Sequence, residues 1–125
     1  MTEAALAWMN NLMDSLSIPY AFMEWKEKPP EDYYFVGEVI EVPTMDRHEN
    51  GHAEYTFILR GFTRKEWMLL ERAKAKIEQR AASTTILPDG TGLAVFYSHG
   101  EHVPTGDMSL KSIKINLSVQ EWRVN

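Results

Sequence analysis

Apolar side chains recur along the start of the chain at the spacing of one helix face. They are Ala5, Trp8, Met9, Leu12, Met13 and Leu16. Thr2 places a hydroxyl at the position of a helix N-cap. Ile18 precedes Pro19, and a residue before proline resists helical dihedrals. The pattern therefore predicts a helix that begins after Thr2 and ends near Leu16.

Runs rich in aromatic and β-branched residues predict the first strands. A short strand, expected at a sheet edge, covers Tyr20 to Trp25 and is followed by a proline-containing loop, Lys26 to Asp32. Tyr33 to Val42 and Tyr55 to Phe62 are stronger strand patterns. Asn50-Gly51 between them favours a tight turn, so the two runs predict a long hairpin.

A second amphipathic helix is predicted after this hairpin. Thr63 to Glu66 has the form of a capping box, with a hydroxyl three residues ahead of a glutamate. The helix that it opens places apolar residues on one face: Trp67, Leu70, Ala73, Ile77 and Ala81. A basic series is offset from that face: Arg72, Lys76 and Arg80.

Two more strands are predicted towards the end of the chain. Leu93 to Ser98 is a short apolar strand, and His99 to Ser112 reads as an irregular stretch. From Ile113 onward apolar and polar residues alternate, as in a half-buried strand. Trp122 falls out of phase with this alternation, which predicts a bulge near Gln120 or Glu121.

The elements follow the order α-β-β-β-α-β-β, and no repeat or linker divides the 125 residues. Because hairpins dominate, we expect a mostly antiparallel sheet with two helices packed on it. The fold class is therefore α+β, and residues 1–125 are expected to form a single domain.

The charge of the chain is unevenly divided. Residues 1–59 carry eleven acidic and three basic side chains, a net of −8, whereas residues 60–125 carry seven and ten, a net of +3. The total of −5 argues against general nucleic-acid binding, which normally requires a basic excess. If the two halves form different surfaces, the charge suits head-to-tail association of identical copies. If the halves interleave, the asymmetry disappears.

Cysteine is absent, which excludes disulfides, thiolate catalysis and cysteine-based metal sites. The N-terminus lacks the basic start and apolar run of a secretion signal, and no apolar stretch is long enough to span a bilayer. A soluble cytoplasmic protein is expected.

All four histidines lie in two short motifs. His48 to His52 matches the zinc-protease pattern H-E-x-x-H, and His99 and His102 form a second pair. The zinc pattern requires a helix to bring both imidazoles to one side, yet Asn50-Gly51 favours a turn. Exposed loop histidines are favoured over a metal site, and a phosphate-binding loop or nucleophile elbow is missing.

The aromatic residues are more numerous than a small core requires. Trp8 and Trp67 fit helix core positions. Four others are candidates for a surface that binds a partner, although core packing is an equal alternative for each: Trp25, Tyr33, Tyr34 and Trp122.

Several segments resemble small tail-completion proteins of long-tailed bacteriophages and prophages. They are Ile18-Pro19-Tyr20 with Phe22 and Trp25, the Pro29-Pro30 loop, Tyr33 to Glu38, Phe57 to Thr63, the helix from Trp67 to Ile77, Ile115-Asn116-Leu117 and Glu121-Trp122-Arg123. The resemblance spans most of the chain, and its motifs are structural.

The resemblance implies a tail terminator, or tail-to-head joining protein, with helices on a sheet. Such proteins form a ring, typically of six subunits, that caps the tail tube and meets the head connector. DNA would pass through the ring without specific binding, and neither catalytic residues nor cofactors are implied. The expected location is the host cytoplasm during assembly and then the virion tail. Two loops, Pro43 to Glu54 and His99 to Ser112, would order on docking, which adds Arg47, His48, His52, His99 and His102 to the candidate interface.

Two alternatives from other functional classes remain. A metal-dependent hydrolase would use the His48/His52 and His99/His102 pairs. A monomeric adaptor would instead bind a peptide along an exposed sheet edge.

Overall fold

The computed structural model describes residues 1–42 and 53–123, apart from the side chains of Val42 and Arg123. Its elements are α1 (Glu3–Ser15), β1 (Tyr20–Phe22), β2 (Tyr34–Val42), β3 (Ala53–Thr63), α2 (Trp67–Ala81), β4 (Ser83–Ile86), β5 (Thr91–His102) and β6 (Lys111–Arg123). None of the described helices is long and apolar enough to cross a membrane.

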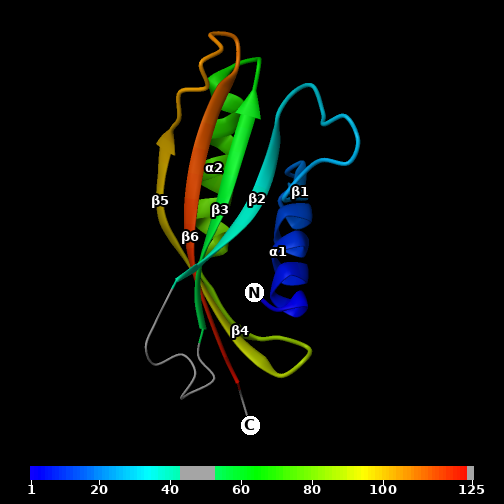
Figure 1. Ribbon diagram of the computed structural model, residues 1–125, viewed down its shortest axis with the longest axis vertical. Coiled ribbons are helices and arrows are strands. Elements are labelled where there is room, and N and C mark those ends of the chain that lie inside the picture. The colour runs from blue at the N-terminus through cyan, green and yellow to red at the C-terminus, as the bar shows by residue number, and fades with distance from the viewer. Residues whose placement is uncertain (43–52, 124–125) are drawn as a thin grey trace.

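One twisted sheet holds all six described strands in the order β1-β2-β3-β6-β5-β4 (Figure 1). Only β1 runs parallel to its neighbour, and the other pairings are antiparallel. The predicted α+β class, the edge position of the first strand and the β2–β3 pairing are therefore confirmed. The predicted turn at Asn50-Gly51 lies outside the described residues.

Strand β4 is absent from the predicted order. It has only four residues, Ser83 to Ile86, and begins directly after α2, so no polar linker separates it from the helical pattern. Its threonines and isoleucine favour extended backbone. The turn at Pro88-Asp89-Gly90 folds it back on β5, where Ile86 pairs with Gly92.

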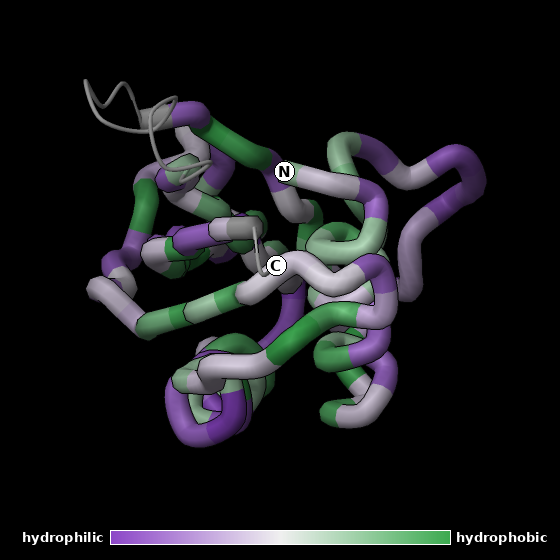
Figure 2. The backbone as a smooth tube through the Cα atoms, turned by 90° about the horizontal axis from the view of Figure 1, so that it is seen from below, coloured by the Kyte–Doolittle hydropathy of each residue, from purple (hydrophilic) through white to green (hydrophobic). Residues whose placement is uncertain are grey.

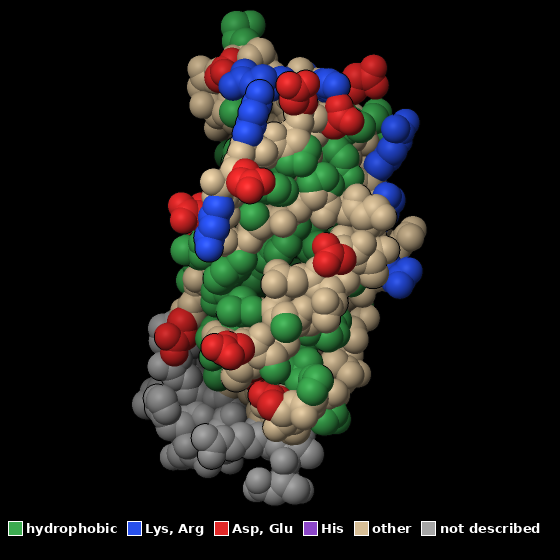
Figure 3. Space-filling model, turned by 90° about the vertical axis from the view of Figure 1, so that its right-hand side faces the viewer, with side chains coloured by type: hydrophobic (Ala, Val, Ile, Leu, Met, Phe, Trp, Pro, Cys, Tyr) green, Lys and Arg blue, Asp and Glu red, His purple; other side chains and the backbone are tan. Residues whose placement is uncertain are grey.

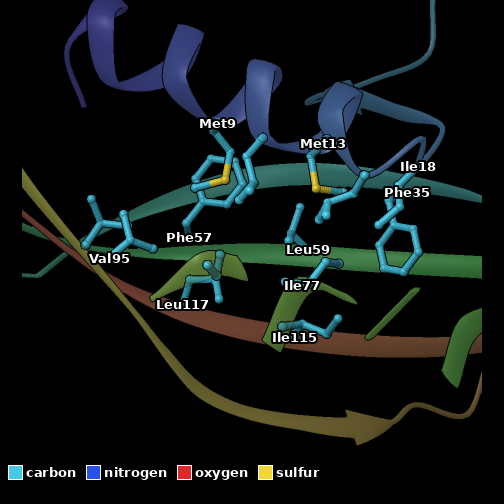
Figure 4. Packing of buried hydrophobic residues seen from close by; sticks show 14 of the residues in the cluster. Met9, Met13, Ile18, Phe35, Phe57, Leu59, Ile77, Val95, Ile115 and Leu117 are labelled. Atoms are coloured by element: carbon cyan, nitrogen blue, oxygen red, sulfur yellow. The ribbon is translucent and has the colours of Figure 1, made fainter. Parts of the chain in front are cut away.

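Both helices lie on the same face of the sheet, and the core lies between the helices and that face. In Figure 4, Met9 and Met13 of α1 point toward Phe57 and Leu59 of β3. Ile77 of α2 belongs to the same buried cluster. Seen from below, α2 turns hydrophobic residues inward and hydrophilic residues outward (Figure 2). We call this side of the sheet the helix-bearing face and the other side the helix-free face.

The start of α1 agrees with its predicted cap, but α2 begins differently. The Thr2 hydroxyl accepts a hydrogen bond from the Ala5 amide at 3.2 Å. The capping box is wrong, because Glu66 is the N-cap of α2 and makes no side-chain cap bond. Thr63 is buried at the end of β3, and its hydroxyl donates to the Asp32 carbonyl at 2.6 Å.

The predicted bulge in β6 is also wrong. Strand β6 pairs in unbroken register with β3, and the register shift lies in β5, between Tyr97 and His99. Glu121 occupies the inward position that an apolar residue was expected to fill, and it is only 4% exposed. Its carboxylate accepts hydrogen bonds from the Thr2 amide at 3.1 Å and the Thr2 hydroxyl at 2.8 Å. A polar partner at the start of α1 thus replaces apolar packing.

Candidate interaction surface

No described helix covers the helix-free face of the sheet. Its side chains occupy alternate positions of four strands: Tyr34, Val36, Glu38 and Ile40 on β2, Thr56, Ile58, Arg60 and Phe62 on β3, Lys114, Asn116, Ser118, Gln120 and Trp122 on β6, and Ala94, Phe96 and His99 on β5. Ile58 and Ala94 are buried by their neighbours but do not belong to the core cluster, because they lie on this other face. Ile40 is 51% exposed and Phe96 is 48% exposed. They lie in one row across the sheet, with Thr56 and Ser118 between them.

The middle of the helix-free face is polar. Arg60 Nε lies 2.8 Å from Glu38 Oε1, and both side chains remain more than a third exposed. Asn116 Nδ2 lies 3.0 Å from His99 Nε2, while Asn116 Oδ1 is buried without a hydrogen-bond partner. These polar side chains are bonded to one another, and the exposed apolar side chains lie beside them.

Three aromatic rings continue this face to the upper end of the sheet. The Trp25 indole meets Tyr34 edge to face, with centroids 6.1 Å apart, and Tyr34 stacks on Phe62 at 5.3 Å. Trp25 Nε1 also donates a hydrogen bond to the Phe35 carbonyl at 3.2 Å. We call these three rings the aromatic ladder. Contacts with β2 and β3 hold it in place, and each ring remains partly exposed.

A pocket of about 570 Å³ opens beside this aromatic ladder. Its lining joins the proline loop, the ends of β2 and β3, and the loop before β6: Lys28, Pro29, Pro30, Glu31, Tyr34, Phe62, Thr63, Arg64, Lys65 and Leu110. The cations on its rim are paired within the chain. Arg64 Nη1 lies 3.0 Å from Asp107 Oδ2, and Lys65 pairs with Asp32. The Ser109 amide, followed by the Arg64 guanidinium, lowers the pKa of Asp107 to about 2.

Two of the predicted interface aromatics have a clear packing role. Tyr33 packs edge to face on Phe35, with centroids 6.3 Å apart, and burial raises the pKa of its hydroxyl. Trp122 lies across β5, where its indole occupies the space that a side chain at Gly92 would need. Any residue larger than glycine at position 92 would displace this ring, so Trp122 packs closely against the β5 backbone at Gly92. Trp122 nevertheless remains partly exposed on the helix-free face.

The histidine pair of β5 is divided between the two faces of the sheet. His99 pairs with Asn116 on the helix-free face, whereas His102 is directed toward α2 and stacks on Trp67 at 4.4 Å. Within residues 1–42 and 53–123 no group of three or more histidine, aspartate or glutamate side chains could hold a metal ion. Arg47, His48 and His52 lie outside the described residues.

Trp67 does not occupy the core position predicted for it. It is 36% exposed and lies in a cluster where His102 Nε2 donates to Glu71 Oε1 at 2.8 Å. Lys74 Nζ lies 3.2 Å from the other oxygen of Glu71. The cluster fastens the first turns of α2 to the end of β5. The bond from His102, then Lys74, lowers the pKa of Glu71.

Stability should therefore depend on pH through Glu71. A lowered folded-state pKa stabilises the protein above the ordinary pKa of 4.5, and this contribution is lost as pH falls through the lowered value. Because the cluster is near the surface, we expect Glu71→Gln to cost about 0.5 kcal/mol at pH 6. The cost should shrink toward zero at about pH 3. Urea unfolding of both proteins at the two pH values measures it, and a cost independent of pH would contradict this account.

Sequence reasoning missed Phe62, Ile40 and Phe96 as members of the candidate surface. Each lies in a predicted strand, but its exposure depends on which face the helices cover. The β2–β3 register places Tyr34 opposite Phe62. A search for aromatic pairs across the predicted hairpin would have found Phe62 only if this register had been known.

Comparisons with known proteins identify the fold but no family. No protein-family model matches the chain, and no curated protein matches it. A solved structure that bears a sequence identifier in place of a functional name superposes with a TM-score of 0.63 at 14% identity. The match covers 93% of this chain and 88% of the other. At this identity the likeness shows a shared fold alone.

Proposed function

We propose that this chain is a structural subunit of a phage or prophage tail, not an enzyme. In this proposal it is a tail terminator that forms a ring on the end of the tail tube and joins it to the head connector. The observation that carries the proposal is the helix-free face, where Ile40 and Phe96 are about half exposed around a polar middle. Covering these two side chains with another protein would remove apolar area from water, which favours association.

The ends of the sheet give such a subunit two separate regions for contact. At the upper end in Figure 1 lie the proline loop, the turn before α2 and the loop before β6. At the lower end β2 stops at Val42, β3 begins at Ala53, and the β4–β5 turn projects. A joining protein needs two such ends, because it meets the tail tube on one side and the connector on the other.

Electron microscopy of tail tubes tests this function. Tubes assembled from the tube protein of the same phage or prophage should carry a ring at one tip when this chain is added, and their growth should stop. Ile40→Ser/Phe96→Ser should abolish binding to the tips, whereas Ile40→Leu/Phe96→Leu, which keeps the apolar surface, should retain it. Tubes that grow unchanged with the wild-type chain would refute the proposal.

A second function is favoured by the pocket beside the aromatic ladder. Its proline, tyrosine and phenylalanine lining suits one apolar side chain of a peptide, as expected for a monomeric adaptor. That reading predicts a monomer at all concentrations with one saturable peptide site. Substitution of Phe62 by Ala would then abolish peptide binding, whereas the tail-terminator function does not require a peptide.

A further inference from the structure

Helix α2 carries a row of exposed cations. Arg72, Lys76 and Arg80 follow one another at four-residue intervals, which places them along one side of the helix over about 12 Å. None of them forms an ion pair with a described residue. Lys74, on the other side of α2, is paired with Glu71. We call these three residues the cationic row.

A groove and an apolar residue adjoin the cationic row. The groove, of about 290 Å³, lies between α1 and α2 and is lined by Trp8, Asn11, Leu12, Ser15 and Arg80. Met68 is 50% exposed one helical turn before Arg72. Arginine, methionine and tryptophan are enriched where proteins bind one another, and a purely solvated helix face would not require them.

Unpaired anions gather in the first half of the chain. Glu3, Asp14, Glu24 and Glu27 are exposed and form no ion pair with a described residue. We call these four residues the acidic side. The side of the molecule that carries α1 shows separate Asp and Glu side chains over its surface, with Lys and Arg along its margins (Figure 3).

The two charge sets lie on different elements, the cationic row on α2 and the acidic side on α1 and the loop after β1. Strands β1, β2 and β3 lie on one side of the sheet and β6, β5 and β4 on the other, so the strands of the two halves do not interleave, whereas α1 and α2 adjoin at the groove lined by Trp8 and Arg80. Among described residues, 1–42 and 53–59 carry nine acidic and two basic side chains, a net of −7, and 60–123 carry seven and ten, a net of +3. One copy therefore presents both a cationic and an anionic surface.

We propose that the cationic row of one copy docks against the acidic side of a second copy. This contact rests on the proposed function, because a closed ring requires two different surfaces that meet head to tail around the circle. Its charges are exposed, so they would steer and align the copies, while Met68 and the groove at Trp8 would supply apolar contact. Association should therefore weaken with added salt.

Two neutralised variants test the contact. Arg72→Gln/Arg80→Gln removes the row but leaves Lys76, whose ammonium lies 3.5 Å from the Leu16 carbonyl at the end of α1. Asp14→Asn/Glu24→Gln/Glu27→Gln removes most of the acidic side. The control, Lys74→Gln/Lys111→Gln, loses the same charge as the first variant at positions outside the row, the acidic side and the helix-free face. Sedimentation velocity at about 50 and about 500 mM NaCl measures the association of each protein.

The wild type and the control should associate at low salt, and each neutralised variant should associate at least about tenfold more weakly. A mixture of the two neutralised variants retains one intact cationic row and one intact acidic side. It should form dimers that cannot grow further, whereas a symmetric contact would be weakened in the mixture as well.

The outcomes separate this inference from the proposed function. If the row variant associates like the wild type and still caps tail tubes, the ring uses other surfaces. The proposed contact is then wrong, and the proposed function stands. If the row variant associates normally but loses binding to a short DNA duplex, the row is a nucleic-acid surface and the inference is again wrong. A wild type that stays monomeric at low salt also overturns it, and tube capping then decides the proposed function separately.

Discussion

Replacing Phe57 by Ala should destabilise the protein by about 3–5 kcal/mol, the usual cost of removing a fully buried phenylalanine. Phe57 is 0% exposed at the centre of the helix-bearing face. It contacts Met9 of α1 and stacks near Phe22 of β1, with centroids 6.2 Å apart. The cavity would therefore loosen both the first helix and the edge strand. Urea unfolding followed by circular dichroism at neutral pH measures the loss.

Phe96→Ala is the matched control, because it removes the same atoms from the other face of the sheet. Phe96 is 48% exposed, so much of its ring is already in water. We expect a loss below about 1 kcal/mol, and no change of the unfolding slope. Equal losses for the two variants would mean that the helices do not define the buried face as described.

Replacing Glu121 by Ala should cost about 2–4 kcal/mol. The carboxylate is almost fully buried and is the acceptor for both the amide and the hydroxyl of Thr2. Its removal leaves these donors without a partner and opens a cavity beneath the first turn of α1. Thermal and urea unfolding measure the effect, with the helical signal as a separate readout of α1.

Two further variants separate the hydrogen bonds from the packing around Glu121. Glu121→Gln keeps the shape and one acceptor, so we expect it to lose about half as much as Glu121→Ala. Thr2→Ala removes the helix cap and one donor and should cost about 1 kcal/mol. If Glu121→Ala is no less stable than Glu121→Gln, the carboxylate does not hold α1 to the last strand.

The fold class could be predicted from the sequence because local periodicity and burial agree over most elements. The spacing of Ala5, Met9 and Leu12 marks the buried side of α1, and the alternation of Ile113, Ile115 and Leu117 marks the buried side of β6. Where prediction failed, a distant partner decided the outcome. Thr63 was expected to cap α2, but its hydroxyl accepts from the Lys65 amide at 3.0 Å and donates to the Asp32 carbonyl. Glu121 was expected to break the alternation, but Thr2 satisfies it in an inward position.

The candidate surface was only partly predictable for the same reason. Trp25 and Tyr34 were identified from composition, and they do lie together on one ladder. Their third member, Phe62, depends on strand register, which the sequence pattern of either strand leaves open. His99 and His102 are three positions apart in a strand, and alternation sends such residues to opposite faces. If a strand had been predicted to continue through His102, the two histidines would have been assigned to opposite faces of the sheet.

The last strand along the chain is also a central strand of the sheet. β6 pairs with β3 and β5 along nearly its full length, and its Glu121 reaches back to the first helix. During synthesis, β6 therefore leaves the ribosome after β3 and β5, the two strands that it joins. The earlier part of the chain leaves two strand edges open until β6 arrives, which exposes it to wrong pairing. The sheet cannot be completed without β6, so we expect that a copy truncated before β6 neither folds nor enters an assembly.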